Sequence, residues 1–244
     1  MKKQDWFENW FNSPWYPILY QHRDELEAAH FVESLMHHIP LSPGASILDL
    51  ACGNGRHARF LHSLGHMVLG VDLSENAIQF AQKSEKPGLS FRVGDMRDAQ
   101  GKEEFDLVLN LFTSFGYFNS EEDNLQMLQS VSASLKKGGL FLLDFMNTTK
   151  VLKNLVPENQ VIREGITFHL KRWLESGFIM KSITFNVGNT EHEYFERVQA
   201  IRKEDFFNYF KKCKMEVLLL SGDYALGPFD EENSDRMLFL VRKS

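Results

Sequence analysis

The chain has 244 residues, of which 43% are hydrophobic and 25% are charged, so its composition excludes disorder as its main character. With a net charge of −6, the chain as a whole lacks the excess of basic residues typical of nucleic-acid-binding proteins, although a local basic patch is not excluded. There is no apolar run of the roughly 18 residues that cross a bilayer, no secretory signal pattern, and only two cysteines. We therefore expect a cytoplasmic protein with reduced thiols and with neither a membrane nor a nucleic-acid partner.

The N-terminal segment, up to about residue 40, is rich in aromatic side chains: Trp6, Phe7, Trp10, Phe11, Trp15, Tyr16 and Tyr20. Residues 25–39 then carry an amphipathic helical pattern, and Pro40 and Pro43 mark the boundary with the strand-rich region. This pattern predicts a helical cap over residues 1–40 ahead of the core.

Residues 41–150 alternate short apolar runs with helical stretches. We expect strands over 46–50, 67–71, 89–93, 105–110 and 140–143. Helices are expected over 56–64, after a Ser74 cap, and after a Ser120 cap with its end at Gly138 and Gly139. Strands separated by helices predict a parallel sheet that is covered on both faces.

The C-terminal third changes character and predicts an antiparallel β insert over 151–202. Three extended runs lie between Val161 and Arg202, with breaks at Gly177 and at the Gly188-Asn189 pair. In the middle run, Lys181 interrupts an apolar strand face.

Residues 203–244 are predicted to return to the core sheet. A helix with Phe206, Phe207 and Phe210 at helical spacing precedes strands over 216–220 and 237–241. No helix fits between these two strands, so they should pair antiparallel.

The strongest motif is ILDLACGNG at residues 47–55, in which a strand runs into a glycine-rich turn and a helix. Gly53 and Gly55 allow a sharp turn and close approach of a ligand to the backbone. Asp72 lies 19 residues after Gly53, at the end of the second strand, where a carboxylate can accept hydrogen bonds from ribose hydroxyls. The spacing predicts a nucleoside-containing cofactor.

The glycine spacing alone leaves a dinucleotide open, because Gly53, Gly55 and Ala58 also satisfy the loose G-x-G-x-x-[GA] pattern. Asp49 argues for S-adenosylmethionine instead, since a carboxylate at that strand end suits an ammonium group and repels a pyrophosphate. The expected C-terminal antiparallel hairpin points the same way.

Five segments together resemble the class I S-adenosylmethionine-dependent methyltransferases. They are DLACGNG at 49–55, VDLS at 71–74, GDMRD at 94–98, FDLVLNLFTSFGYF at 105–118 and LKKGGLFLLDF at 135–145. The resemblance covers residues 46–145 in the family's order. It implies a Rossmann-like, mostly parallel seven-stranded sheet with an antiparallel C-terminal strand.

A narrower resemblance is to small-molecule N-methyltransferases, including deoxysugar amine dimethyltransferases. It rests on Tyr16, Tyr20 and Arg23, on the strings ACGNGRH and GDMRD, and on the F-[ST]-S-x-G-Y string at 112–117. The match weakens after Asp144, so the identity of the substrate does not carry over.

The resemblance implies S-adenosylmethionine as cofactor. It places Asp95 and Met96 at the adenine, and a backbone carbonyl of Asn110 or Leu111 at the methionyl ammonium. The cofactor-binding set is Tyr20, Arg23, Asp49, Ala51, Gly53, Gly55, Asp72, Leu73, Asp95, Met96, Asn110 and Leu111. Each has an ordinary structural alternative, such as capping, strand termination or core packing.

Around the acceptor we expect Tyr16, Phe115 and Tyr117, with core packing as the alternative for each ring. The N-terminal segment and the insert should converge over the carboxyl edge of the sheet, because methyl transfer must exclude water. Tyr20 is then expected close to the transferring methyl group.

Other titratable groups receive no catalytic role. The nine histidines show no metal-ligand spacing, Cys52 reads as a packed residue, and no general base stands out. A C-terminal set is expected to form ion-pair or lid contacts: Asp223, Tyr224, Asp235 and Arg236.

The sequence therefore predicts an S-adenosylmethionine-dependent methyltransferase with a small-molecule acceptor, with nitrogen as the expected methylated atom. Three alternatives stay open: a nicotinamide-dependent oxidoreductase, a nucleic-acid or protein methyltransferase, and a cofactor-binding module without activity. The Asn/Asp-Pro-Pro-aromatic string typical of nucleic-acid methyltransferases is absent after the fourth strand, where residues 110–113 read NLFT.

Overall fold

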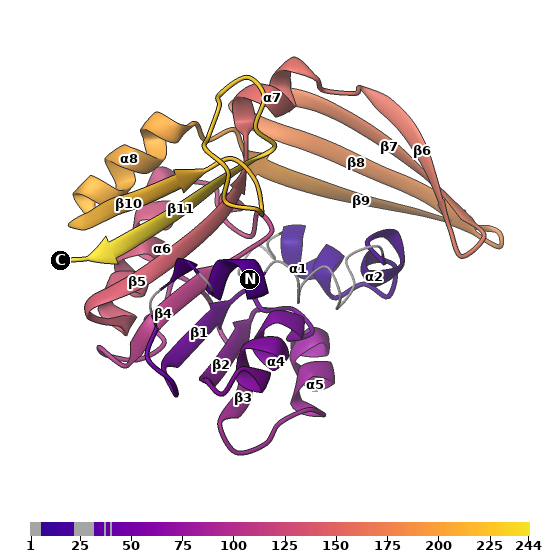
Figure 1. Ribbon diagram of the computed structural model, residues 1–244. Coiled ribbons are helices and arrows are strands. Elements are labelled where there is room, and N and C mark those ends of the chain that lie inside the picture. The colour runs from indigo at the N-terminus through magenta and orange to yellow at the C-terminus, as the bar shows by residue number, and fades with distance from the viewer. Residues whose placement is uncertain (1–5, 22–31, 37, 40) are drawn as a thin grey trace.

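The computed structural model describes residues 6–21, 32–36, 38, 39 and 41–244. A seven-stranded sheet in the order β10-β11-β5-β4-β1-β2-β3 forms the centre of the molecule (Figure 1). Its strands are β1 (Ser46–Leu50), β2 (Met67–Asp72), β3 (Leu89–Val93), β4 (Phe105–Asn110), β5 (Leu135–Met146), β10 (Met215–Ser221) and β11 (Arg236–Lys243). The expected fold class is confirmed.

Only β11 reverses the strand direction in this sheet. Neighbouring strands from β5 through β4, β1, β2 and β3 pair in parallel, whereas β11 pairs antiparallel with both β5 and β10. The central strands read as continuous apolar runs because both of their faces are buried. The expected C-terminal antiparallel pair is present.

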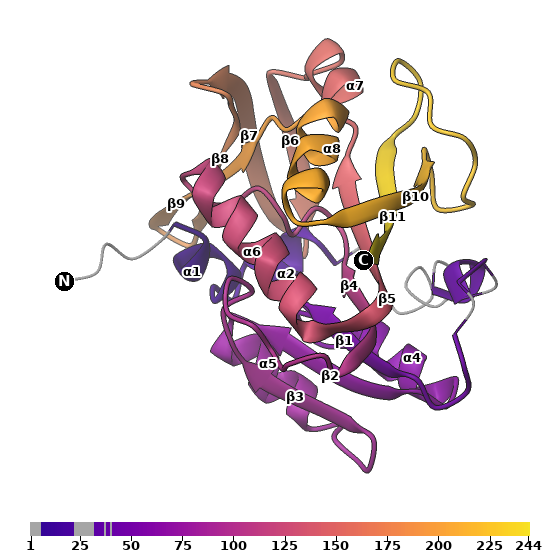
Figure 2. The same cartoon turned by 90° about the vertical axis from the view of Figure 1, so that its left-hand side faces the viewer.

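Helices cover the two faces of the main sheet, as Figure 2 shows. On one face, α4 (Arg56–Ser63) and α5 (Glu75–Gln82) pack against β1, β2 and β3; on the other lie α6 (Glu121–Ser134) and α8 (Lys203–Lys212). The hydroxyl groups of Ser74 and Ser120 accept hydrogen bonds from the first turns of α5 and α6, at 3.2 and 3.1 Å, as expected for N-caps.

The end of α6 differs from the prediction. The helix stops at Ser134, and β5 begins at Leu135, so Gly138 and Gly139 lie inside the strand. The pairing of β5 with β4 jumps from Leu135 to Leu140 across these glycines. They form an irregularity in the strand instead of a helix cap. Glycine suits both positions, because Gly138 has a φ of 74° and a Cβ at Gly139 would lie 2.9 Å from the Lys136 carbonyl.

A second sheet of four antiparallel strands follows α7 (Thr148–Lys153). It comprises β6 (Glu158–Arg163), β7 (Ile166–Glu175), β8 (Phe178–Val187) and β9 (Thr190–Gln199). The expectation of three runs was wrong because Glu164 and Gly165, both at positive φ, form a hairpin turn inside the first run. The breaks at Gly177 and Gly188 are confirmed.

The N-terminal helices α1 (Trp6–Phe11) and α2 (Tyr16–Leu19) lie between the second sheet and the α4–α5 side of the core (Figure 1). Trp10 and Leu19 are buried against the inner face of the second sheet, which presents Phe168, Ile183 and Phe185. This aromatic cluster joins the two segments that flank the core in sequence.

The predicted helix over 25–39 lies partly outside the described residues. Residues 32–36 and 38 are helical, and Val32 and Leu35 are fully buried. The domain limits at residues 40, 150 and 202 stay predictions.

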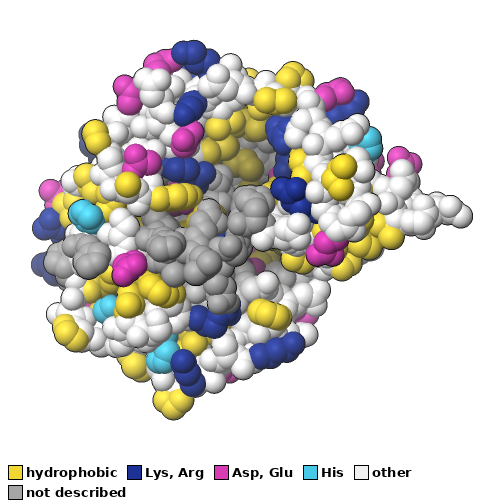
Figure 3. Space-filling view, turned by 45° about the vertical axis from the view of Figure 1, so that its right-hand side comes forward, with side chains coloured by type: hydrophobic (Ala, Val, Ile, Leu, Met, Phe, Trp, Pro, Cys, Tyr) yellow, Lys and Arg dark blue, Asp and Glu magenta, His cyan; other side chains and the backbone are white. Residues whose placement is uncertain are grey.

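Charged side chains of both signs are scattered over the face shown in Figure 3, and hydrophobic side chains gather where that face is hollowed. Among the described helices, none combines the length and the hydropathy needed to span a membrane.

Candidate functional site

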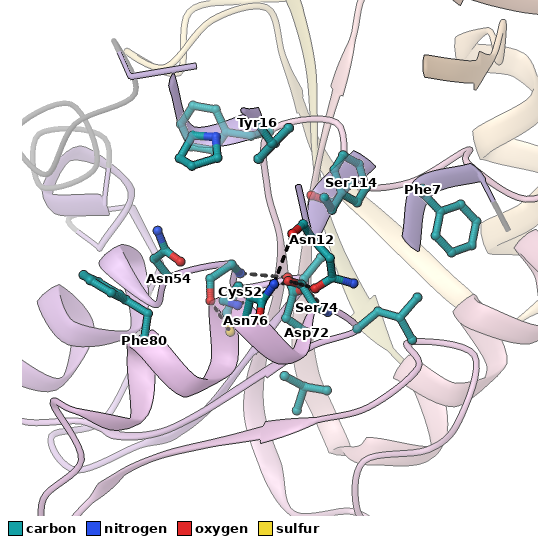
Figure 4. Close-up of a pocket in the computed structure, with 18 of the residues that line it drawn as sticks. Phe7, Asn12, Tyr16, Cys52, Asn54, Asp72, Ser74, Asn76, Phe80 and Ser114 are labelled. Atoms are coloured by element: carbon teal, nitrogen blue, oxygen red, sulfur yellow. Dashed lines mark hydrogen bonds between the residues drawn. The ribbon is translucent and has the colours of Figure 1, made fainter. Parts of the chain in front are cut away.

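A pocket of about 760 Å³ opens at the carboxyl ends of β1, β2 and β4, within the size range of small-molecule sites. Parallel strands bring these ends to one edge, so residues far apart in sequence meet there. In Figure 4, Tyr16 lies across the cavity from Asp72, and Asn12 reaches down to Ser74 and Asn76.

Most of the predicted site residues line this pocket. They are Tyr16, Tyr20, Asp49, Ala51, Gly53, Asp72, Leu73, Asp95, Met96, Leu111 and Tyr117. Gly55, Asn110 and Phe115 do not line it, and Arg23 lies outside the described residues. Most of the residues predicted from the sequence therefore lie around one pocket, and the binding role of each stays a prediction.

The glycine loop is held by Asp72. The amide of Gly53 donates to one carboxylate oxygen at 2.8 Å, and the amide of Ser74 donates to the other at 2.8 Å. Gly53 and Gly55 have φ values of 54° and 77°, and a Cβ at Gly55 would clash with the Phe91 ring at 2.4 Å. A carboxylate oxygen accepts two bonds, so Asp72 retains capacity toward the pocket while it fixes the loop.

Asp49 is a carboxylate in an almost fully buried position, with 1% of its surface exposed. Burial and the nearby Asp72 raise its pKa to about 7, against the smaller lowering effects of Arg56 and the Ala58 amide. Its Oδ2 atom has no hydrogen-bond partner among the described residues. A buried acceptor without a donor at a pocket wall suits a cationic ligand group.

His57, at the start of α4, was not predicted as a site residue. It lines the pocket, is 5% exposed, and stacks on the Phe112 ring with centroids 5.1 Å apart. Burial, together with the charges of Arg56 and Arg59, lowers its pKa to about 3, so the imidazole is neutral at physiological pH. Its place in the ACGNGRH string was the available signal.

Asp95 lies at the pocket wall but is strongly engaged by Arg97. The backbone amide and the guanidinium of Arg97 make four contacts with its two carboxylate oxygens, at 2.6–3.1 Å. Burial raises the pKa of Asp95, but the Arg97 contacts outweigh it and hold the pKa below its ordinary value. An adenine amine would have to share this carboxylate with Arg97.

The segment after β4 divides between pocket and core. Leu111 and Tyr117 line the pocket, whereas Phe115 is fully buried and packs against Phe206 with ring centroids 5.6 Å apart. Phe115 thus takes the core alternative, and Gly116, with a φ of 82°, separates it from Tyr117. Asn110 is buried, and its amide donates to the Leu50 carbonyl at 3.2 Å.

The N-terminal segment closes over the pocket and is fastened at one end to α5. Ser74 donates to the Asn12 side chain at 2.7 Å, and Asn76 donates to the Asn12 carbonyl at 3.0 Å (Figure 4). The segment therefore forms the outer wall of the site.

The other end of the segment is fastened to the second sheet. Glu196 accepts hydrogen bonds from Trp10 at 2.7 Å and from Tyr20 at 2.6 Å, and it pairs with Lys181 at 3.1 Å. Lys181 also donates to the Tyr20 hydroxyl at 2.5 Å. The interruption of an apolar strand by Lys181 was the sequence signal for this contact, and Glu196 had none.

The second sheet contacts the N-terminal segment on the side away from the pocket and does not cover the pocket itself. None of the described lining residues comes from residues 158–199. Both elements were expected to converge over the carboxyl edge of the sheet, but only the N-terminal segment lines the pocket there. The second sheet reaches the site through Tyr20, which lines the cavity and binds Glu196 and Lys181.

Further lining residues were missed by the sequence reasoning, mainly because they lack a distinctive type. They are Phe7, Phe11, Asn12, Ser13, Pro14, Pro17, Gln21, Cys52, Asn54, Arg56, Val71, Ser74, Asn76, Ala77, Phe80, Gly94, Phe112, Ser114 and Phe118. Cys52 is buried, and burial raises the pKa of its thiol, in keeping with a packed residue. The part of the chain that the structure describes contains no metal-binding group of three or more ligands.

Comparison with known proteins identifies the family of this chain. Residues 47–139 match the methyltransferase domain family. A Geobacillus sp. (strain WCH70) protein named as a methyltransferase is 30% identical over 213 residues, 81% of this chain and 84% of that protein. A dTDP-3-amino-3,6-dideoxy-alpha-D-glucopyranose N,N-dimethyltransferase of Streptomyces fradiae is 30% identical over 206 residues, 80% of this chain and 79% of that enzyme.

A similar fold occurs in a solved structure, an S-adenosylmethionine-dependent methyltransferase from Clostridium acetobutylicum ATCC 824. Its TM-score is 0.78 at 20% identity, and the match covers 93% of this chain and 95% of that one. The relatives at 30% identity and the matched methyltransferase domain replace the nicotinamide-dependent alternative. With the glycine loop, the strand-end carboxylates and the reversed β11 strand, these matches establish that the chain belongs to the class I S-adenosylmethionine-dependent methyltransferases.

Proposed function

We propose that this enzyme methylates an amine nitrogen of a small molecule. The observation that carries the proposal is the aromatic wall of the pocket. The Phe11 ring lies 5.0 Å from the Tyr16 ring and 5.5 Å from the Tyr117 ring, and all three side chains line the cavity. Aromatic faces attract methylated ammonium groups, so such a wall favours an amine and its N-methyl product.

The residues of the pocket fit S-adenosylmethionine, which when bound supplies a methyl group already activated on a sulfonium. The unpartnered Oδ2 of Asp49 suits the ammonium of the cofactor, and Asp72 suits the ribose hydroxyls. The Met96 region and Asp95 would adjoin the adenine. These roles, like the expected carbonyl contribution of Asn110 and Leu111, are part of the proposal.

The titratable groups at the pocket favour nitrogen over oxygen as the methylated atom. Among the described lining residues, Asp49 accepts a hydrogen bond from the Ala58 amide, Asp72 and Asp95 are bound by amide or guanidinium donors, and His57 has its pKa lowered to about 3. None is placed as an evident base for a hydroxyl. A neutral amine carries its own lone pair and needs only alignment and exclusion of water.

A sugar amine is the first acceptor class to test, because the Streptomyces fradiae relative is named for N,N-dimethylation of an amino sugar nucleotide. The test incubates the protein with radiolabelled S-adenosylmethionine and a dTDP-amino sugar, and with the matched dTDP-sugar that carries a hydroxyl at the same carbon. Free amino acids, a peptide, tRNA and DNA complete the panel.

Transfer to the amino compound with none to its hydroxyl match is the expected result. Labelling of the hydroxyl compound would overturn the nitrogen assignment. Labelling of protein or nucleic acid with none of any small molecule would overturn the acceptor class while leaving the methyltransferase family in place.

A further inference from the structure

The turn after β4 is held in an unusual backbone conformation. Phe112 and Thr113 are consecutive residues other than glycine, with φ values of 58° and 59°. Residues other than glycine rarely adopt this left-handed backbone conformation, and they remain in it only when surrounding contacts hold them there. The contacts described below therefore keep this turn in a conformation that the two residues would not adopt on their own.

Asp144, on β5, binds the backbone of both residues. Its Oδ2 atom accepts the Phe112 amide at 2.7 Å, and its main-chain carbonyl accepts the Thr113 amide at 3.1 Å. The Asp144 side chain is fully buried. It lies on the same face of β5 as the apolar residues Leu140 and Leu142. A carboxylate in such a position is costly unless donors saturate it.

Arg236, at the start of β11, completes the clamp. Its guanidinium donates to Asp144 Oδ1 at 2.6 and 2.7 Å and to the Thr113 hydroxyl at 2.8 Å. Asp144 pairs with Leu238 in the strand register and Arg236 pairs with Met146, which makes Asp144 and Arg236 diagonal neighbours on one sheet face. Tyr224 adds a bond to Asp144 Oδ2 at 3.1 Å.

The clamped turn builds one wall of the pocket. Leu111, Phe112 and Ser114 all line the cavity. The Phe112 ring stacks on His57 and lies 4.6 Å under the Arg56 guanidinium, so it links the turn to the helix at the end of the glycine loop. A shift of Phe112 would therefore alter the space beside the cofactor loop.

We infer that Asp144 and Arg236 are positioning residues for methyl transfer, which act by fixing the Phe112–Thr113 turn against the cofactor loop. Neither side chain lines the pocket, so neither touches the ligands there. The inference rests on the proposed function only in that the kcat measurement needs an amine acceptor. A displacement of about 1 Å at a reacting site can cost roughly a hundredfold in rate.

The test compares Arg236→Lys and Asp144→Asn with the parent enzyme. Arg236→Lys keeps the charge of the buried pair but loses the fork that reaches Asp144 and Thr113 together. The control is Asp106→Asn, because Asp106 also binds one backbone amide (Ser46, 2.8 Å) and one cation (Lys136, 2.8 Å), but at the opposite end of the sheet.

All measurements are made at a temperature where urea titration shows every protein more than nine-tenths folded. We expect kcat for the amine that the acceptor panel selects to fall at least tenfold in both variants, with S-adenosylhomocysteine affinity within threefold of the parent. Hydrogen exchange in the 111–114 peptide should be at least tenfold faster in both, and the control should match the parent in all three readouts.

Parent-like kcat and exchange in folded Arg236→Lys would overturn the inference, since the pair would then be only structural. If Asp144→Asn does not fold, Arg236→Lys decides alone. If no amine is methylated, the proposed function fails, but the exchange measurement still decides whether the pair fixes the turn.

Discussion

Glu196 offers the sharpest test of how the N-terminal segment is held over the pocket. Its side chain is 16% exposed, that of its partner Lys181 is 14% exposed, and it also accepts bonds from Trp10 and Tyr20. Glu196→Gln keeps the shape of the side chain but removes the negative charge that faces the Lys181 ammonium.

The expected cost is about 3 kcal/mol of unfolding free energy. Removing one partner of a buried pair costs roughly 3–5 kcal/mol. The lower end applies because this pair is only partly buried and the substituted amide still accepts a hydrogen bond. In a chain of this length, roughly 2–4 °C of melting temperature is lost per kcal/mol, so a fall of about 6–12 °C is expected. The double variant Lys181→Met/Glu196→Gln should recover part of the loss, because the buried ammonium is removed together with its counter-ion.

Urea unfolding and limited proteolysis of the N-terminal segment measure the effect. The control is Glu158→Gln, because the Lys171–Glu158 pair joins β6 and β7 of the same sheet at 3.2 Å, with 61% and 67% of the side chains exposed. Such an exposed pair should contribute roughly 0–1 kcal/mol. Equal losses for the two variants, or unchanged proteolysis in Glu196→Gln, would refute the anchoring role.

The pH dependence of this loss follows from the direction of the pKa shift. Burial raises the pKa of Glu196, but Lys181, Tyr20 and Trp10 outweigh it, so the folded-state pKa lies below the ordinary 4.5. The contribution is therefore complete above about pH 4.5 and is lost as pH falls through the folded pKa. The gap between the parent and Glu196→Gln should be constant from pH 5 to 8 and shrink in acid.

Three further predictions concern the ligands. Asp72→Ala should weaken S-adenosylhomocysteine binding at least about tenfold in calorimetry, since unpaired ribose hydroxyls and loop amides cost roughly 1–3 kcal/mol; unchanged affinity would place the ribose elsewhere. Because the pKa of Asp49 is about 7 and its ionised form should bind the ligand ammonium, affinity should fall about tenfold per pH unit below 7 and level off above it, whereas Asp49→Asn should show no such slope. Tyr20→Phe should lower turnover more than ligand affinity, and a change confined to stability would make Tyr20 purely structural.

The main sheet and most of the cofactor end of the pocket could be predicted from the amino-acid sequence alone. Buried parallel strands appear as uninterrupted apolar runs, and the glycine loop needs residues that tolerate positive φ, so both leave local marks. Asp49, Asp72 and Asp95 could be placed together because each lies at or just beyond the end of a parallel strand, and those ends share one edge.

The way in which the acceptor end of the pocket is closed depends on packing between segments that lie far apart in the chain. Glu196 lies 176 residues from Tyr20, and the strand that carries it has no mark that distinguishes a buried anchor from a surface acid. Phe115 and Tyr117 share a motif, yet one enters the core and the other the pocket. Local propensity and alternation act over a few residues, whereas these choices depend on which surfaces pack together across the chain.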